Sequence, residues 1–252
     1  MEPILTLTNV NLTYNGVAAE THALRGVSFS VLPGEFVAIV GPSGCGKSSI
    51  LSLIAGLIAP SGGAIELMGK PIEGPNAKVG YMLQRDHLFE WRTVWQNVLL
   101  GQQIRRMPAS AHDCAERLLR TYGLYEFRDR RPSELSGGMR QRAALIRTLA
   151  VDPEVLLLDE PFSALDYQTR LTLCDEVAAI IRTEGKTALF VTHDIAEAIS
   201  IADRVIVLTS RPARVKRDMA IDMPAGRPFA RRSMPEFRGY FNEIWGELEE
   251  NG

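Results

Sequence analysis

The spacing of hydrophobic positions changes along this chain and divides it into segments of predicted strand and helix. Alternating apolar and polar residues at 4–8 and 27–31 predict half-buried strands. Continuous apolar runs predict buried strands at 36–40, 79–83, 155–158, 188–192 and 205–208, and helical patterns lie between them at 47–58, 139–151, 166–182 and 195–201. Because strands alternate with helices of this length, we expect an α/β fold with a mainly parallel sheet.

The stretch 93–131 breaks this alternation. It has the pattern of two or three helices, one of them at 111–122, and contains no good candidate for a strand. We therefore expect a helical subdomain inserted into the α/β core.

Composition excludes several classes of protein. The 252 residues are 46% hydrophobic and 23% charged, which excludes a disordered chain. With 28 basic and 30 acidic residues the net charge is −2, so we expect no nucleic-acid partner bound over the whole surface. No apolar run approaches the roughly 20 residues of a membrane-spanning helix. Three well-separated cysteines and no visible secretory signal favour the reducing cytoplasm.

Charge is less even near the C-terminus. Nine basic residues between 204 and 238 outnumber three acidic ones. A solvated face is the simpler interpretation, and a surface for anionic lipid or an acidic partner is the alternative.

A glycine-rich segment follows the predicted strand 36–40. Its spacing is G-x-x-x-x-G-K-S, and it lies between a buried strand and a helix, the context in which this motif binds phosphate. Lys47 is placed to neutralise the β- and γ-phosphates, and the Ser48 hydroxyl to coordinate Mg²⁺. The segment therefore predicts a nucleotide-binding loop consisting of Gly41, Pro42, Ser43, Gly44, Cys45, Gly46, Lys47, Ser48 and Ser49.

Two carboxylates follow the buried strand 155–158. Sheets of α/β proteins bind ligands at the carboxyl ends of their strands, so Asp159 and Glu160 are expected beside the phosphate loop. Asp159 is the natural carboxylate for Mg²⁺, and Glu160 is placed to polarise the attacking water as general base. This pairing predicts nucleotide hydrolysis.

A second candidate anion site precedes the helix at 139–151. Ser136 has the side chain of a helix cap, and Gly137 and Gly138 expose backbone N–H groups. Alone this would be an ordinary helix cap. The run Leu-Ser-Gly-Gly-Met-Arg-Gln-Arg at 135–142, however, resembles the signature motif of the ATP-binding cassette (ABC) transporter ATPases.

The other motifs of that family follow in order from Tyr14 to His193, which is most of the chain. The resemblance implies that Tyr14 stacks on adenine and that His193 contacts the γ-phosphate as a catalytic residue. Gln84 is similar to the glutamine that touches Mg²⁺ and senses the membrane subunit. Ser-Ala-Leu-Asp at 163–166 resembles the loop that crosses the dimer interface, which assigns Asp166 to that interface.

The resemblance also implies a fold and a domain organisation. We expect a P-loop NTPase core with N-terminal antiparallel β strands, a mainly parallel sheet and a helical subdomain at about 93–150. Residues 1–230 would form one ABC ATPase domain, and residues 231–252 a C-terminal helical extension.

Cofactors and partners follow from the same resemblance. They are ATP, Mg²⁺ and a second copy of the chain or a paralogous ATPase subunit, in a head-to-tail dimer. Each ATP would lie between the phosphate loop of one chain and Ser136, Gly137 and Gly138 of the other. The other partners that the resemblance implies are integral membrane permease subunits and an extracytoplasmic solute-binding protein. With such partners, we expect the chain to be a peripheral protein at the cytoplasmic face of the cell membrane.

Two positions within the motifs alter the expected chemistry. Met139 stands where many family members carry glutamine, and a methionine cannot supply a polar contact with nucleotide. Cys45 lies beside a helix N-terminus, which predicts a lowered thiol pKa. Alkylation at Cys45 is then expected to block the ATPase, with protection by ATP.

Two short segments favour an importer. Residues 91–94 and 208–215 are similar to the nitrate/sulfonate/taurine subfamily, which includes relatives proposed to carry thiamine-precursor pyrimidines. Residues 86–94 correspond to the groove that receives a helix of the membrane subunit, where Phe89 and Trp91 are either anchors for that helix or residues packed inside the domain. The alternatives are an ABC exporter subunit, an ABC ATPase that works on ribosomes or in DNA repair, and a nucleotide-sensing module.

Overall fold

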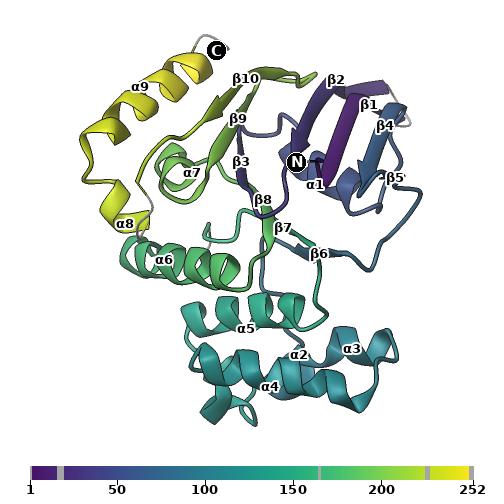
Figure 1. Cartoon of the computed structure of the whole chain (residues 1–252), viewed down its shortest axis with the longest axis vertical. Coiled ribbons are helices and arrows are strands. Elements are labelled where there is room, and N and C mark those ends of the chain that lie inside the picture. Colours follow the sequence, from purple (N-terminus) through teal and green to yellow (C-terminus); the bar gives the residue numbers. More distant parts are fainter. Residues whose placement is uncertain (1, 16–19, 164–165, 225–227, 250–252) are drawn as a thin grey trace.

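Two β-sheets occupy the upper part of the molecule in Figure 1, and helices form the lower part and one side. The computed structural model describes residues 2–15, 20–163, 166–224 and 228–249. The larger sheet has the strand order β10-β9-β3-β8-β7-β6 and is parallel except for β10. Its strands are β3 (Phe36–Val40), β6 (Val79–Met82), β7 (Val155–Asp159), β8 (Thr187–Val191), β9 (Arg204–Leu208) and β10 (Val215–Ala220).

The smaller sheet is antiparallel and has the order β2-β1-β4-β5. Its strands are β1 (Leu5–Asn15), β2 (Glu20–Val31), β4 (Gly62–Leu67) and β5 (Lys70–Pro71). Register shifts interrupt the pairing of β1 with both of its neighbours.

The parallel sheet separates two hydrophobic cores, because successive side chains of a strand point to opposite faces. On β3, Phe36 and Ala38 belong to one core, whereas Val37 and Ile39 belong to the other. The first core contains side chains of α5 (Gly137–Leu149), α6 (Tyr167–Thr183) and α7 (Ile195–Ile201). The second lies between the two sheets and contains α1 (Lys47–Ile54). Burial on both faces explains why these strands are continuously apolar in sequence.

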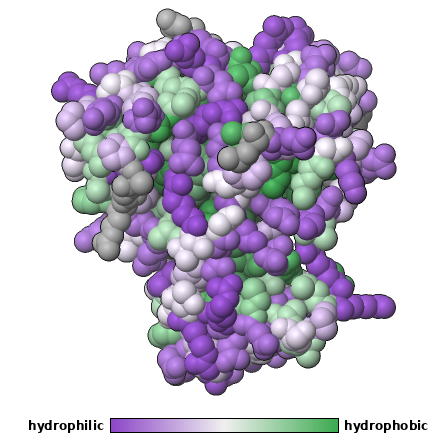
Figure 2. Space-filling view, in the orientation of Figure 1, coloured by the Kyte–Doolittle hydropathy of each residue, from purple (hydrophilic) through white to green (hydrophobic). Residues whose placement is uncertain are grey.

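The lower part of the molecule in Figure 1 is helical. Its elements are α2 (Val94–Val98), α3 (Leu100–Ile104) and α4 (His112–Thr121), which lie beside α5, and three short 3₁₀ turns at Ala109–Ala111, Tyr125–Phe127 and Pro132–Glu134. In the space-filling view of Figure 2, hydrophilic residues dominate the visible face, and green hydrophobic residues gather over the place where Figure 1 labels α2 and α3.

The C-terminal residues pack onto the core. Helix α8 (Pro228–Arg231) lies against α6 and α7, and α9 (Pro235–Glu249) lies against α7 and β9. Ile244 of α9 is fully buried in the first core. Among the basic residues between 204 and 238, Arg204 pairs with Glu35 and Asp218, and Arg231 donates to the backbone carbonyl oxygen of Ala202. Among the helices of the described residues, none combines the length and the hydropathy that a membrane crossing demands.

The structure confirms the predicted fold class and corrects several boundaries. The helix expected at 47–58 ends at Ile54, because Gly56 adopts φ +70° and a Cβ there would lie 2.1 Å from the Gly74 carbonyl oxygen. The expected strands 4–8 and 27–31 are parts of the longer β1 and β2. The sequence pattern missed β4, β5 and β10.

Candidate functional site

The glycine-rich loop connects the carboxyl end of β3 to the start of α1. Lys47, only 6% exposed, folds back over the loop, where its Nζ donates to the carbonyl oxygens of Gly41 (2.8 Å) and Pro42 (3.0 Å). Gly46 precedes the helix with φ +122°, and α1 has no side-chain cap. The first N–H groups of this helix are therefore available to an anion, and the helix dipole favours negative charge there.

This loop forms one wall of an open cavity of about 600 Å³. Tyr14 lies at its edge, 44% exposed, and its hydroxyl is 3.0 Å from Ser49 Oγ. The lining includes most of the predicted nucleotide-binding residues and both predicted catalytic residues; its members are Tyr14, Ala23, Ser43, Gly44, Gly46, Lys47, Ser48, Ser49, Glu160, His193 and Arg211. Backbone N–H groups, a lysine and an exposed aromatic ring in one cavity are the features expected of a nucleoside triphosphate site.

Ser48 and Asp159 meet at the floor of the site, at the start of α1 and the end of β7. Ser48 Oγ donates to Asp159 Oδ1 (2.9 Å), and the Tyr81 hydroxyl donates to Oδ2 (3.3 Å). Burial raises the pKa of Asp159, although these two hydrogen bonds oppose the shift. Burial and the Asp159 charge raise the pKa of Tyr81 to about 12, so its hydroxyl keeps its proton. A hydroxyl and a carboxylate held together are hard oxygen ligands of the kind that Mg²⁺ takes alongside nucleotide phosphates and water.

Glu160 follows β7 in a left-handed conformation, with φ +44°. Its backbone N–H donates to the Val191 carbonyl on β8 (3.0 Å), which fixes the turn. Its Oε2 lies 3.3 Å from His193 Nδ1 and accepts from Gln84 Nε2 at 3.2 Å. Residues from three strand ends therefore converge on one carboxylate at the edge of the cavity.

Gln84 takes a different place from the one expected of a magnesium ligand. Within the described part of the chain, its amide donates to Glu160 Oε2 and to Ser163 Oγ (3.3 Å) and forms no hydrogen bond with Ser48 or Asp159. Its role at the metal stays a prediction. Of the interface loop at 163–166, residues 164 and 165 lie outside the described part of the chain.

The signature residues lie on another surface. Ser136 caps α5 by accepting from the Met139 N–H (3.3 Å), and Gly137 and Gly138 form the first helical positions. Asp166 caps α6 by accepting from the Thr169 N–H (3.0 Å), and that hydrogen bond lowers the pKa of Asp166. These four predicted residues line a separate cavity of about 490 Å³. That cavity and the cavity at the phosphate loop share no lining residue.

The lowered thiol pKa expected of Cys45 is wrong, whereas the effect of alkylation on the ATPase stays a prediction. The residue is 2% exposed and packs in the second core, and burial raises the pKa of its thiol although nearby Lys47 opposes the shift. Cys45 is not among the residues that line the cavity, and its thiol lies against Gly41: a Cβ on Gly41 would lie 3.0 Å from Cys45 Sγ and 3.1 Å from Leu208 Cβ. A position beside a helix N-terminus does not outweigh this desolvation.

Arg211 is a lining residue that sequence reasoning did not single out. It follows β9, and its Nε (3.2 Å) and Nη2 (2.5 Å) donate to the carbonyl oxygen of Gly44 in the phosphate loop. Backbone hydrogen bonds between Ala213 and the Ala23 and Arg25 region of β2 hold the segment in place. The only signal in the sequence was its position within the 208–215 segment, which gave no residue role.

Comparison with known proteins gives one consistent result. The family model described as ABC transporter matches residues 24–163. The chain is 43% identical over 247 residues to the ABC transporter ATP-binding protein YtlC of Bacillus subtilis (97% of this chain, 95% of that protein). It is 40% identical to the nitrate import ATP-binding protein NrtD of Synechocystis sp. (95% and 93% covered) and to the taurine import ATP-binding protein TauB of Jannaschia sp. (85% and 81%).

A solved structure agrees with these relatives. The ATP-binding cassette MJ0796, in a dimeric post-hydrolysis state bound to ADP and Pi, superposes with a TM-score of 0.74 at 30% identity, covering 87% of this chain and all of that one.

Proposed function

The chain belongs to the ABC transporter family as an ATPase that uses ATP and Mg²⁺, and from that premise we propose that it powers an importer of a small solute. The observation that carries the proposal is the 40% identity, over most of both chains, to proteins named as nitrate and taurine import ATP-binding proteins. The solute we propose is a nitrate-, sulfonate- or taurine-like anion or a thiamine-precursor-like molecule.

Two copies of the chain are proposed to work head to tail. The phosphate loop lines one cavity of the chain, and Ser136–Gly138 line another that shares no residue with the first. A single chain therefore has both halves of an ATP site, but on different surfaces. A second copy, or a paralogous ATPase subunit, turned to face the first would place each signature helix opposite the other chain's phosphate loop. The N-terminus of α5 would then bind the γ-phosphate in the way that suits a helix N-terminus.

The proposed hydrolysis depends on positioning and charge. Lys47 and the N–H groups of α1 hold the phosphates, and Ser48 and Asp159 hold Mg²⁺, which neutralises phosphate charge when bound. Glu160 accepts a hydrogen bond from the attacking water, and His193, beside the Glu160 carboxylate, reaches the γ-phosphate.

The proposed contact with the permease lies on residues 85–92, which we call the docking segment. Trp91 is 71% exposed, and its ring stacks on Phe89 with centroids 4.7 Å apart. Of the two earlier interpretations of Trp91, its exposure supports an anchor for a partner helix. The chain would thus sit at the cytoplasmic face of the membrane, held there by protein contacts, with an extracytoplasmic binding protein delivering the solute.

Reconstitution tests this proposal. The chain would be incorporated into proteoliposomes with a candidate permease and a candidate solute-binding protein, sought among the neighbouring genes, with ATP inside the vesicles. Labelled nitrate, taurine and a thiamine-precursor pyrimidine would be offered outside, and a Glu160→Gln complex would be the matched control. ATP-dependent uptake of one of these solutes supports the proposal. In vesicles loaded with the same solutes, ATP-dependent efflux in place of uptake would make the chain an exporter subunit, and absence of any permease partner would contradict a transport role.

A further inference from the structure

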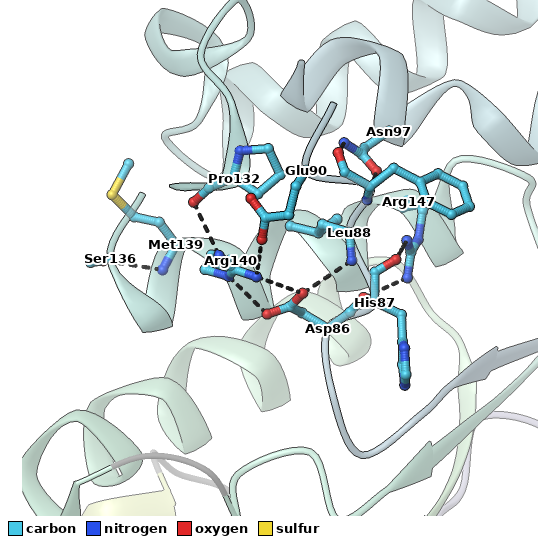
Figure 3. A network of polar contacts seen from close by, with 11 residues as sticks. Asp86, His87, Leu88, Glu90, Asn97, Pro132, Ser136, Met139, Arg140 and Arg147 are labelled. Carbon is cyan, nitrogen blue, oxygen red and sulfur yellow. Dashed lines mark hydrogen bonds and ion pairs between the residues drawn. The ribbon is translucent and has the colours of Figure 1, made fainter. Parts of the chain in front are cut away.

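A network of ion pairs ties the docking segment to the signature helix (Figure 3). Arg140 lies one helical turn after Ser136, and its backbone N–H donates to the Ser136 carbonyl oxygen (2.9 Å). Its guanidinium donates to both Asp86 oxygens, from Nε at 2.9 Å and from Nη2 at 3.3 Å, and Nη2 also donates to Glu90 Oε1 at 2.8 Å. One side chain of α5 thus holds two carboxylates of the docking segment.

The Arg140–Asp86 pair is shielded from solvent. The side chains are 27% and 18% exposed, so water screens the pair less than it screens a surface salt bridge. Burial alone would raise the pKa of Asp86, but the hydrogen bonds from Arg140 and from the Leu88 N–H lower it below its usual value. Asp86 is therefore ionised at neutral pH and holds the arginine in a charge-assisted fork.

A second arginine of α5 fixes the backbone of the same segment. Arg147, two turns after Arg140, donates to the carbonyl oxygens of Asp86 and His87, both at 2.7 Å. His87 has φ +45°, so these bonds stabilise a bend that an L-residue rarely adopts. The Arg147 guanidinium donates to main-chain carbonyl oxygens of the docking segment, whereas the Arg140 guanidinium pairs with its side-chain carboxylates. Charge substitutions therefore separate the effect of the Arg140 pair from the effect of the bend.

The docking segment also connects to the hydrolytic site. It begins directly after Gln84, whose amide donates to Glu160. At its other end, buried Asn97 accepts from the Phe89 N–H (2.8 Å) and donates to the Phe89 carbonyl oxygen (3.1 Å), which holds the base of the exposed aromatic pair. The segment therefore reaches Glu160, the aromatic pair and the signature helix. Arg140 and Arg147 both connect it to that helix, and Arg140, one turn from Ser136, does so through side-chain carboxylates.

We infer that Arg140 is a positioning residue, which makes the signature helix move together with the docking segment so that permease contact and ATP-driven closure depend on each other. This inference rests on the proposed dimer. Such coupling is reciprocal in free energy: if a partner bound to the docking segment favours closure, closure on ATP favours partner binding by the same factor. The ATP-dependent response of residues 85–92 in the isolated protein therefore reports the connection without the permease.

The test measures hydrogen–deuterium exchange in the full-length chain carrying Glu160→Gln, with and without ATP and Mg²⁺. In this parent, ATP is expected to slow exchange both in 136–149 and in 85–92, and to drive dimerisation, followed by light scattering. Arg140→Gln is expected to confine the protection to 136–149 and to raise the ATP concentration for half-maximal dimerisation about tenfold, the effect of one charge-assisted pair. Arg140→Lys keeps the positive charge but cannot donate two hydrogen bonds in the geometry of a guanidinium. It should restore part of the ATP-dependent protection of 85–92 and part of the lost ATP response of dimerisation.

Arg120→Gln is the matched control. Arg120 donates from Nε and Nη2 to the same oxygen, Oε1 of Glu116, on the exposed face of α4. Among the described residues it forms no hydrogen bond or ion pair with the docking segment, so its loss should leave both readouts at parent values. A merely structural role for Arg140 would loosen 85–92 equally with and without ATP. Unchanged ATP-dependent protection in Arg140→Gln contradicts the inference. A parent that stays monomeric with ATP contradicts the proposed dimer, and the inference with it.

Discussion

Glu160→Gln is the sharpest test of the chemistry assigned to the site. The substitution keeps the size of the side chain. It also keeps an oxygen that can accept the hydrogen bond from Gln84 Nε2, which is 3.2 Å from Glu160 Oε2 in the unsubstituted chain. It removes the carboxylate that would take a proton from water. Positioned general bases contribute about 10²–10⁴-fold, so kcat should fall by that factor, equivalent to roughly 2.7–5.4 kcal/mol at about 1.36 kcal/mol per decade.

Stability and nucleotide affinity should change little. The Glu160 side chain is 23% exposed, and its backbone bond to the Val191 carbonyl does not involve the carboxylate. We expect the free energy of unfolding to stay within about 0.5 kcal/mol and KM for ATP within about threefold. With ATP the variant should accumulate as a dimer, because the γ-phosphate is removed only slowly.

The assay is phosphate release at saturating ATP, with single-turnover measurements to isolate the chemical step. Glu154→Gln is the matched control: Glu154 precedes the same strand, pairs with Lys78 at 2.8 Å on the surface and lies 41% exposed. That control should turn over normally. A Glu160→Gln chain with kcat within threefold of wild type would refute the assignment of Glu160 as general base.

Three further predictions concern other parts of the molecule. Because burial raises the pKa of Cys45, iodoacetamide at pH 8 should label it at least about tenfold more slowly than the half-buried Cys114, as judged by peptide mass spectrometry. Glu184→Gln should lower the free energy of unfolding at pH 7 by about 1–2 kcal/mol, discounted because its partner Arg117 is half exposed. The Arg117 hydrogen bond lowers the pKa of Glu184 from 4.5, so this stabilisation is present above pH 4.5 and is lost as pH falls through the lowered pKa. The free energies of unfolding of the two proteins, measured by chemical denaturation, should therefore become equal at low pH. Arg211→Ala should raise KM for ATP about tenfold with kcat retained, and an unchanged KM in steady-state kinetics would contradict a nucleotide-binding role.

The core of the fold was predictable because strands that are buried on both faces of a sheet have continuous apolar sequences. The expected strand 36–40 and the expected helix 195–201 coincide with β3 and α7. The nucleotide-binding loop was predictable for a second reason, since its residues are adjacent in the chain and its shape depends on local glycines. Family resemblance supplied the roles of residues far apart in sequence, such as Tyr14 and His193.

The missed elements are half exposed. Strand β10 carries Lys216, Arg217 and Asp218 in its centre, because it is an edge strand that buries few side chains. Strand β4 begins with two glycines, and only Ile65 and Leu67 of its residues are buried. Strands rich in polar residues or glycine lack the regular spacing of hydrophobic residues from which a strand could be predicted.

The misjudged chemistry at the site depended on tertiary contacts. Cys45 is buried in the second core, which also contains Leu208 of β9, 163 positions later in the sequence. Arg211 reaches Gly44 across 167 positions of sequence. The ion pairs of Arg140 with the docking segment span 50 positions or more. Local sequence patterns carry no information on contacts of this separation.

The separation of the two cavities predicts complementation between inactive chains. Lys47→Ala damages the phosphate-loop half, and Ser136→Arg damages the signature half, so each variant alone should hydrolyse ATP poorly. Head-to-tail pairing of the two variants yields one site with both defects and one with neither. In an equal mixture half of the dimers are mixed and each has one intact site of two, so about a quarter of the wild-type rate should return, if each site works independently. Phosphate release measured across mixing ratios checks this, and a mixture no faster than the sum of its parts would contradict composite sites that work independently.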